Sequence, residues 1–305
     1  MAYRHIIIES EARLSVKNNQ LRVETERVDS TVPIEDINTL LVENRRSVLS
    51  AALLSTLAKN GTAVFICDEF HMPCAVFQPY LQHSRQLTVT KNQLALTVPA
   101  KKQLWKQLIS AKISNQSKCL ALCGHSQEIA ETAEKLEKMS KQVRSGDEGN
   151  SESHAAALYF PALFGGGFKR SGDSDYKNAW LNYGYSIIRG CIARTLCVFG
   201  FFPLYGVHHH SSLNQFNLAD DFIEPFRPIV DLFTVQNIAG ETSLSPQNKR
   251  RLVNLLNYDI CVAGNMYALS YAIERTIQSF SAVCTGKRKD LLLPELVPLK
   301  QHSYE

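Results

Sequence analysis

Two carboxylates three positions apart, Asp221 and Glu224, are the side chains whose spacing has the clearest chemical consequence. On a helix, residues three apart share one face, and two carboxylates held that close repel each other unless a cation lies between them. A metal ion is the natural cation. The alternative is that Asp220 and Asp221 stabilise the positive end of a helix, while Glu224 is solvated on the same turn.

A histidine triplet, His208, His209 and His210, precedes these acids. Three consecutive side chains cannot all point at one ion from an extended or helical backbone, so at most one or two of them can bind a metal. One imidazole with two carboxylates suits Mg²⁺ or Mn²⁺, and the nitrogen ligand favours Mn²⁺. Two other sets of candidate ligands lack the paired short spacings of structural zinc sites. They are Cys67, His71 and Cys74, and Cys119, Cys123 and His125.

Glu152 is the third candidate for a chemical role. It opens a predicted helix over residues 152–164, directly after the polar loop 145–150, and the other residues of this helix are mostly small or apolar. A carboxylate in a first helical turn is favoured by the positive end of the helix dipole, but the same residue can equally belong to a site. The residues alone leave both interpretations open.

The first eighty residues have the pattern of a small β-rich domain. Residues 13–17 and 21–25 alternate polar with apolar side chains around Asn18-Asn19-Gln20, which predicts a hairpin whose turn tolerates positive φ. A helix is expected over residues 47–60, with Ser47 able to cap its start and Gly61 its end. Further strands are expected at residues 6–8, 37–42, 63–67 and 75–77.

From about residue 85 the pattern is helical, and we expect an α+β protein in which a larger all-α catalytic domain, residues 81–305, follows the β-rich domain, residues 1–80. A helix over residues 218–236 must bend or break at Pro225 and Pro228, since each lacks an N–H and clashes with the preceding turn. The Pro- and Leu-rich tail after Lys289 either docks on a partner or frays. The other expected helices are a long one following Pro99, then 126–143, 152–164, 176–199, one opening at 245–246, and 265–280.

Composition and charge narrow the class of protein. The eight cysteines are scattered with no CxxC pair, as in reduced cytosolic proteins, and no run approaches the ~18 apolar residues that a membrane span requires. We therefore expect neither a signal peptide nor an anchor. Residues 1–80 hold 8 Lys and Arg against 10 Asp and Glu, and residues 81–305 hold 25 against 19. A polyanion is expected to meet the second part, unless this asymmetry is ordinary surface variation.

Taken in order, the candidate pieces resemble one known family. Leu-Asn-Tyr-Gly-Tyr at 181–185, Gly-Val-His-His at 206–209 and Asp-Phe-Ile-Glu-Pro-Phe-Arg-Pro at 221–228 stand in the order and spacing of the CRISPR-associated integrase, the adaptation nuclease also called CRISPR-associated protein one. The resemblance covers the whole chain and is greatest to the type II branch, which accompanies single-protein RNA-guided effector nucleases. The chain departs from the pattern at Ser153, where many members have glycine.

The resemblance implies that Glu152, His209 and Glu224 bind a catalytic Mg²⁺ or Mn²⁺. The family's histidine lies three positions after a glycine, here Gly206, which selects His209 from the triplet. Asp221 matches an additional acidic position one turn before Glu224, and it is interpreted as an accessory acid.

The implied activity is that of a metal-dependent DNA endonuclease and integrase. The 3′ ends of short foreign DNA fragments, called spacers, attack the repeat borders of a CRISPR array, and water in place of the hydroxyl gives hydrolysis. Basic side chains would hold the phosphates of double-stranded and branched DNA. The candidates are Arg227, Arg250 and Arg251, of which Arg227 is more readily explained as a structural partner for a nearby acid.

The resemblance also implies a homodimer formed through the β-rich domains, with two dimers flanking a dimer of a small companion adaptation protein in the cytoplasm of a prokaryote. A strand-rich domain of ~80 residues is marginal by itself, which is compatible with burial against a copy of itself. Two rival hypotheses remain. One is a catalytically silent DNA-binding subunit in which the same acids are structural, and the other is a carboxylate-pair hydrolase such as a glycosidase, in which Glu152 and Glu224 need no metal.

Overall fold

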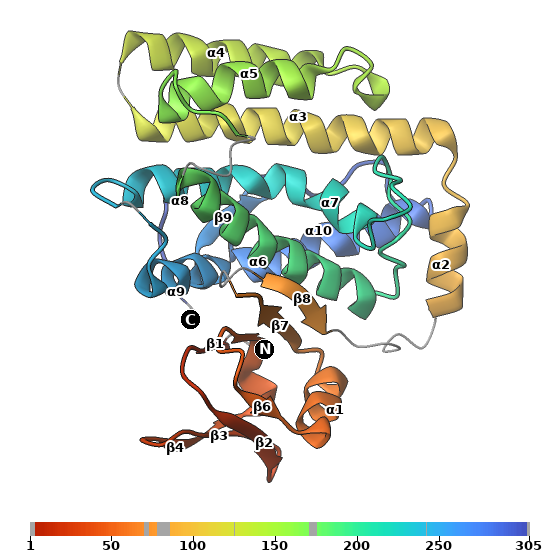
Figure 1. Ribbon diagram of the computed structural model, residues 1–305. Coiled ribbons are helices and arrows are strands. Elements are labelled where there is room, and N and C mark those ends of the chain that lie inside the picture. The colour runs from red at the N-terminus through yellow and green to blue at the C-terminus, as the bar shows by residue number, and fades with distance from the viewer. Residues whose placement is uncertain are drawn as a thin grey trace.

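A computed structural model of the chain describes residues 4–69, 73–77, 86–124, 126–170, 176–241 and 243–303. Its N-terminal part is rich in strands, and its C-terminal part is mostly helical (Figure 1). This is the α+β architecture that the sequence predicts, and the fold class is therefore confirmed.

The N-terminal part consists of two small sheets and the helix α1 (Ala51–Lys59). In the sheet of order β1-β5-β7-β8, the first three strands run parallel and β8 pairs antiparallel with β7. The second sheet has the order β4-β3-β2-β6. The strands are β1 (Arg4–Ile8), β2 (Arg13–Lys17), β3 (Gln20–Glu24), β4 (Asp29–Pro33), β5 (Ile37–Val42), β6 (Val48–Leu49), β7 (Ala63–Cys67) and β8 (Pro73–Phe77).

Of the turn and the helix cap predicted for this part, the turn is confirmed and the cap is not. The hairpin of β2 and β3 is confirmed, and Asn18 and Asn19 form its turn with φ of 50° and 57°. The predicted cap of α1 is wrong. Ser50, not Ser47, accepts the N–H of the first helical turn, whereas the Ser47 hydroxyl accepts the N–H of Ala12.

The C-terminal part is built around one long helix, α3 (Val98–Cys123), which Thr97 caps and which has Pro99 in its first turn. The others, in chain order, are α2 (Gln86–Leu94), α4 (Gln127–Gln142), α5 (Ser151–Phe164), α6 (Tyr176–Val198), α7 (Asn217–Ile223), α8 (Arg227–Asn237), α9 (Pro246–Asn254) and α10 (Leu269–Cys284), with the short 3₁₀ helices η1 (Ile34–Asp36), η2 (Ser145–Asp147), η3 (Glu224–Phe226) and η4 (Leu255–Asn257).

Helix α3 lies between two layers. Helices α4 and α5 cover one side of it, and α7, η3 and α8 lie against the other (Figure 1). Its apolar residues recur at helical spacing, and the buried Leu104, Leu108 and Ile109 show why it serves as a central element. The interruption predicted at Pro225 and Pro228 is confirmed, because α7 and α8 are separate helices joined by η3.

A small antiparallel sheet of order β10-β9-β11 interrupts the helical part. Residues 265–268, which the sequence assigned to the last helix, form strand β10 (Asn265–Ala268), and α10 begins only at Leu269. The turn between β9 (Asp259–Val262) and β10 is Ala263-Gly264, both with positive φ, as a tight two-residue hairpin requires. The tail packs on its own chain through β11 (Pro294–Glu295), which pairs with β9.

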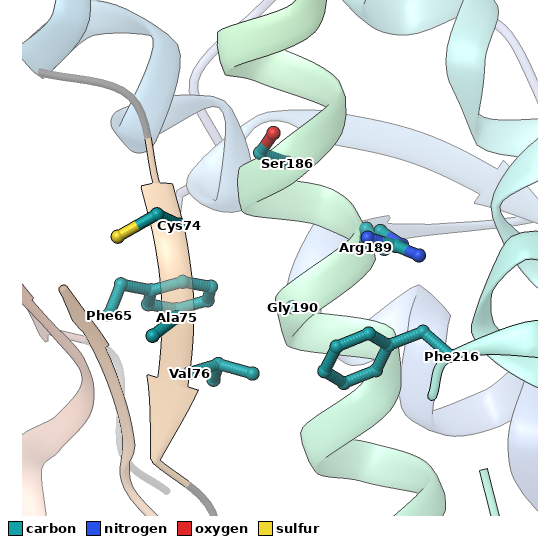
Figure 2. A pocket seen from close by; sticks show the side chains of 8 residues that line it. All are labelled: Phe65, Cys74, Ala75, Val76, Ser186, Arg189, Gly190 and Phe216. Carbon is teal, nitrogen blue, oxygen red and sulfur yellow. The ribbon is translucent and has the colours of Figure 1, made fainter. Parts of the chain in front are cut away.

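The N-terminal sheet packs against helix α6 through β7 and β8 (Figure 1). Phe65 of β7 lies over Gly190 of α6, and a Cβ added at Gly190 would come within 1.9 Å of the Phe65 ring. A small cavity of about 60 Å³ opens beside this contact, with Cys74 of β8 and Arg189 of α6 in its lining (Figure 2). Glycine at position 190 is therefore what allows the sheet to approach the helix.

Two ion pairs join helix α9 to the N-terminal part. Lys249 Nζ lies 2.7 Å from Glu43 Oε1 with both side chains buried, and Arg250 pairs with Glu9 at the surface. The predicted domain boundary between residues 80 and 81 lies outside the described residues, so the division into two domains stays a prediction. None of the helices in the described ranges combines the length and the apolar character that a membrane span needs.

Replacing Gly190 with alanine should destabilise the fold by about 1–3 kcal/mol, because the new methyl group overlaps the Phe65 ring and this cost exceeds the helix propensity that alanine adds. Urea unfolding would measure the loss. Gly166→Ala is the control, since a Cβ there meets no described atom within 4 Å. Adding Phe65→Leu to Gly190→Ala should recover part of the loss, and strict additivity of the two changes would contradict the contact.

Candidate active site

Glu224, the first residue of η3, is a buried carboxylate held between two cations. Arg227 Nε donates to its Oε1 at 2.9 Å, and Lys112 Nζ lies 2.5 Å from its Oε2. Burial alone raises the pKa of this carboxyl, but Arg227 and Lys112 outweigh burial and lower the pKa to about 2. Glu224 is therefore ionised at neutral pH.

Lys112 of helix α3 bridges the two glutamates that the sequence singled out. Its Nζ lies 2.6 Å from Glu152 Oε1 and 2.5 Å from Glu224 Oε2, and only 10% of its side chain is exposed. Burial lowers the pKa of the ammonium, but the attraction of Glu224 and then of Glu152 outweighs this effect and raises it. Two carboxylates thus converge on one cation position, which a lysine occupies.

Glu152 stands in the first turn of α5, where its backbone is fixed by Asp147. The Asp147 carboxylate accepts the N–H of Ser151 at 2.8 Å and the N–H of Glu152 at 3.0 Å, satisfying amides that a helix start leaves without partners. The residue before the helix, Asn150, has a φ of 51° and turns the chain into it. The Glu152 side chain is 32% exposed, so the pair of glutamates is open to solvent on this side.

Asp221 of α7 is fully buried and organises the histidine loop. Its carboxylate accepts the backbone N–H groups of Val207 at 2.5 Å, His208 at 3.2 Å and His209 at 3.0 Å. Gly206 lets the loop close this tightly, because a Cβ there would lie 2.1 Å from the His209 carbonyl oxygen. Asp221 thus has a structural role in this loop, and its role as an accessory acid stays a prediction.

The His209 ring is oriented by the same carboxylate. Its Nδ1 lies 2.8 Å from Asp221 Oδ1, and because a carboxylate only accepts, Nδ1 carries the hydrogen and Nε2 keeps its lone pair when the ring is neutral. This hydrogen bond raises the pKa of His209 against the opposing effect of burial, and Glu224 is among the charges that raise it further. The ring is 41% exposed, which leaves Nε2 a suitable metal ligand.

Trp105 connects the histidine loop to helix α3. Its ring stacks on His208 with centroids 4.1 Å apart and an interplanar angle of 3°, and it meets the His209 ring edge-on at 5.6 Å. Trp105 and Lys112 are seven residues apart on α3, which is two helical turns and the same face. One helix face therefore carries both the support of the histidines and the partner of the glutamates.

Asn115, also on α3, ties two further segments to this helix. Its side-chain amide donates to the carbonyl oxygens of Pro225 at 2.8 Å and Pro294 at 2.9 Å, and its oxygen accepts the N–H of Leu296 at 2.9 Å. The position of η3, and hence of Glu224, depends in part on this buried amide.

The predicted site residues thus fall into two groups. Glu152 and Glu224 share Lys112, while His209 is held by Asp221, and within the described residues no three His, Cys, Asp or Glu side chains are arranged as a metal site. A divalent cation nevertheless fits the donor chemistry. Two carboxylates meet at a cation position, and the buried Glu224 Oε2 has no described partner that satisfies hydrogen-bond geometry.

The predicted DNA-binding arginines each have partners on the chain. Arg227 pairs with Glu224 and lies over the Tyr185 ring at 4.5 Å, as expected of a structural partner for a nearby acid. Arg250 pairs with Glu9, and Arg251 bonds Asn237 at the surface. A role in binding DNA stays a prediction for all three. Of the alternative zinc ligands, His71 and His125 lie outside the described residues.

Sequence reasoning missed Lys112, Trp105, Asp147 and Asn115. Asn115 and Lys112 carried a readable signal, because each interrupts the apolar stripe of α3 where a hydrophobic residue would be expected. The stronger signal is that of the charged Lys112. Its partners are 40 and 112 positions away in the sequence, and no local spacing connects them.

Comparison with known proteins identifies the family. The family model described as CRISPR associated protein Cas1 matches residues 5–247, a range that contains Glu152, His209, Asp221 and Glu224. The chain belongs to the Cas1 family. It is also 41% identical over 309 aligned residues, covering all of both chains, to the CRISPR-associated endonuclease Cas1 of Neisseria meningitidis serogroup C. The family resemblance inferred from the sequence is therefore confirmed.

Solved structures of low sequence identity share the Cas1 fold of this chain. A casposase bound to integration product is similar with a TM-score of 0.78 at 20% identity, covering 95% of this chain and 92% of that chain. A Cas6-RT-Cas1–Cas2 complex gives a TM-score of 0.75 at 18% identity, covering 95% of this chain and 36% of the other. At these identities the likeness concerns the fold.

Asp221→Asn should loosen the histidine loop of this Cas1-family chain. An amide offers one acceptor oxygen where the carboxylate offers two charged ones, so we expect a loss of about 2–4 kcal/mol of stability. Amide hydrogen exchange at residues 207–209 should accelerate. The matched control is Asp220→Asn, which breaks the pair with Arg189 but leaves the loop amides their acceptor. Unchanged exchange at 207–209 in Asp221→Asn would contradict this role.

Asp231 of α8 is a second buried carboxyl near the site. The Tyr159 hydroxyl donates to it at 2.9 Å, and the Tyr185 hydroxyl donates to its other oxygen. Burial raises the pKa of Asp231 to about 6, against the lowering effect of these two hydrogen bonds. The folded protein thus holds this proton more tightly than the unfolded chain, in which the pKa has its ordinary value of 3.8.

The stability that Asp231 contributes should be complete below pH 3.8 and lost as the pH rises through about 6. Relative to Asp231→Asn, the wild type should therefore lose about 3 kcal/mol across this range. Guanidinium unfolding of both proteins at several pH values tests this. Asp29→Asn serves as the control. Arg22 lowers the pKa of the exposed Asp29, so the stability that Asp29 contributes is lost as the pH falls, which is the opposite direction. A stability difference that is independent of pH would refute the assignment.

Proposed function

We propose that this chain is a divalent-metal-dependent DNA endonuclease and integrase that inserts spacers into a CRISPR array during the adaptation stage of antiviral defence. The convergence of Glu152 and Glu224 on one buried cation position carries the proposal. Two comparisons support it. The 41% identical relative is a CRISPR-associated endonuclease, and a structure of similar fold is a casposase bound to integration product.

Glu152, Glu224 and His209 Nε2 are the groups that would hold Mg²⁺ or Mn²⁺. A bound divalent ion would supply Lewis-acid activation of a DNA 3′-hydroxyl and neutralise charge on the phosphate under attack. The residues of the chain prepare this chemistry. Glu224 is ionised because Arg227 and Lys112 lower its pKa, and Asp221 fixes the His209 tautomer that leaves Nε2 with a lone pair.

A single site of this kind accounts for two reactions. When the attacking group is a 3′-hydroxyl, one phosphodiester is exchanged for another and the fragment is joined to its target. When water attacks, the same bond is hydrolysed. The open side of the site, where the Glu152 side chain is partly exposed, is where a DNA strand would approach.

The assembly proposed for this chain follows the family. We propose a homodimer formed through the β-rich domain of residues 1–80, joined by a small companion adaptation protein and acting on double-stranded and branched DNA in a prokaryotic cytoplasm. The Cas6-RT-Cas1–Cas2 complex, whose fold is similar, supports a partner of this type. Arg227, Arg250 and Arg251 are proposed phosphate contacts, and binding would then weaken with salt.

Incubating the metal-free protein with branched DNA and Mn²⁺ or Mg²⁺ tests the proposed function. Strand cleavage or joining should appear with metal, stop with EDTA, and fall at least about 100-fold in Glu152→Gln and in Glu224→Gln. Glu134→Gln is a matched control, because Glu134 is an exposed carboxylate on α4 that pairs only with Lys138 among the described residues.

Activity that survives either site variant would contradict the assignment of the ligands. DNA binding with no cleavage or joining in any metal would favour a silent DNA-binding subunit. Hydrolysis that is insensitive to EDTA would favour a carboxylate pair acting without metal.

A further inference from the structure

Lys112 occupies the position at which the two proposed carboxylate ligands meet. Its ammonium lies 2.6 Å from Glu152 Oε1 and 2.5 Å from Glu224 Oε2, while Arg227 engages the other oxygen of Glu224. Two positive charges therefore already balance the two negative ones. The sequence motifs did not include this lysine.

We infer that Lys112 is a positioning residue that holds Glu152 and Glu224 together and competes with the divalent cation for the space between them. The inference rests on the proposed function of this site as a metal centre. It assigns to a residue of helix α3 the control of metal affinity, a role separate from that of the ligands themselves.

Electrostatics requires the competition. With Lys112 in place, a divalent ion between the glutamates would add two positive charges next to an ammonium in a largely buried position, where like charges repel strongly. The ammonium must therefore leave at least one carboxylate when the ion enters. Glu224 is not left without a partner by this movement, because Arg227 still donates to its Oε1.

Lysine suits such a movable partner. Its ammonium is a compact charge on a flexible four-carbon stem, and it can withdraw by rotation of the stem, whereas a guanidinium fork holds a carboxylate in fixed geometry. Before the ion binds, the same ammonium prevents the two carboxylates from repelling each other apart. Lys112 thus keeps the site formed in the absence of metal at the expense of affinity for it.

Titrating the metal-free full chain with Mn²⁺, and following unbound Mn²⁺ by electron paramagnetic resonance, tests the inference without reference to activity. Lys112→Met should bind Mn²⁺ more tightly by about tenfold or more, because the competing charge is gone. Lys112→Arg should bind no more tightly than the wild type. The matched control is Lys249→Met, which removes a different buried lysine, one that pairs with Glu43 of the N-terminal part and with neither proposed ligand, and should leave Mn²⁺ affinity unchanged.

Affinity in Lys112→Met that is equal to or weaker than that of the wild type overturns the inference while leaving the metal centre in place. Absence of Mn²⁺ binding in the wild type, or binding that survives Glu224→Gln, overturns both the inference and the proposed ligands. If Lys112→Met is folded but too unstable without metal for titration, the rise in its melting temperature with Mn²⁺ decides. A rise larger than that of the wild type supports competition, and an equal or smaller rise refutes it.

Discussion

A buried carboxylate needs positively charged partners. In this molecule the partners of Glu224 determine how helix α3 packs against η3. Arg227 supplies one charge from three residues along the chain, and Lys112 supplies the other from a different helix. Because the second partner is distant in sequence, its contact fixes α3 against η3. The attraction that lowers the pKa of Glu224 to about 2 is thus also a tertiary constraint, and it brings Glu152 to the same place.

Helix α3 is the common support of features that belong to different segments. Trp105 holds the histidine loop, Lys112 holds the glutamates, and Asn115 holds η3 and the tail. A rigid helix keeps these three contacts at fixed separations, so groups from the loop, from α5 and from η3 are held in fixed positions relative to one another. Asp221 positions His209 separately, through the loop. The two sets of residues interact electrostatically, because the negative charge of Glu224 raises the pKa of His209.

Features that depend on neighbouring residues could be predicted from the sequence, and features that depend on contacts between distant residues could not. The break at Pro225 was predictable because a missing N–H acts within one helical turn. The cap of α1 was not, since a serine at either position 47 or 50 can cap a helix, and in the fold the Ser47 hydroxyl instead accepts the N–H of Ala12, 35 residues earlier. Family pattern identified Glu152 but gave no reason for its placement. The bridge through Lys112 needs the fold, because no spacing in the sequence brings those charges together.

Asn115 and two of its hydrogen-bond partners are translated at very different times. The helix that carries this residue can form early in synthesis, but the carbonyl of Pro294 lies 179 positions later and the N–H of Leu296 lies 181 positions later. Until that segment has been translated and has paired with β9, the buried amide lacks two of its three partners, and the support beneath η3 is incomplete. A nascent chain therefore carries all the groups proposed for DNA cleavage before the segment that completes the hydrogen bonds of Asn115 has been translated.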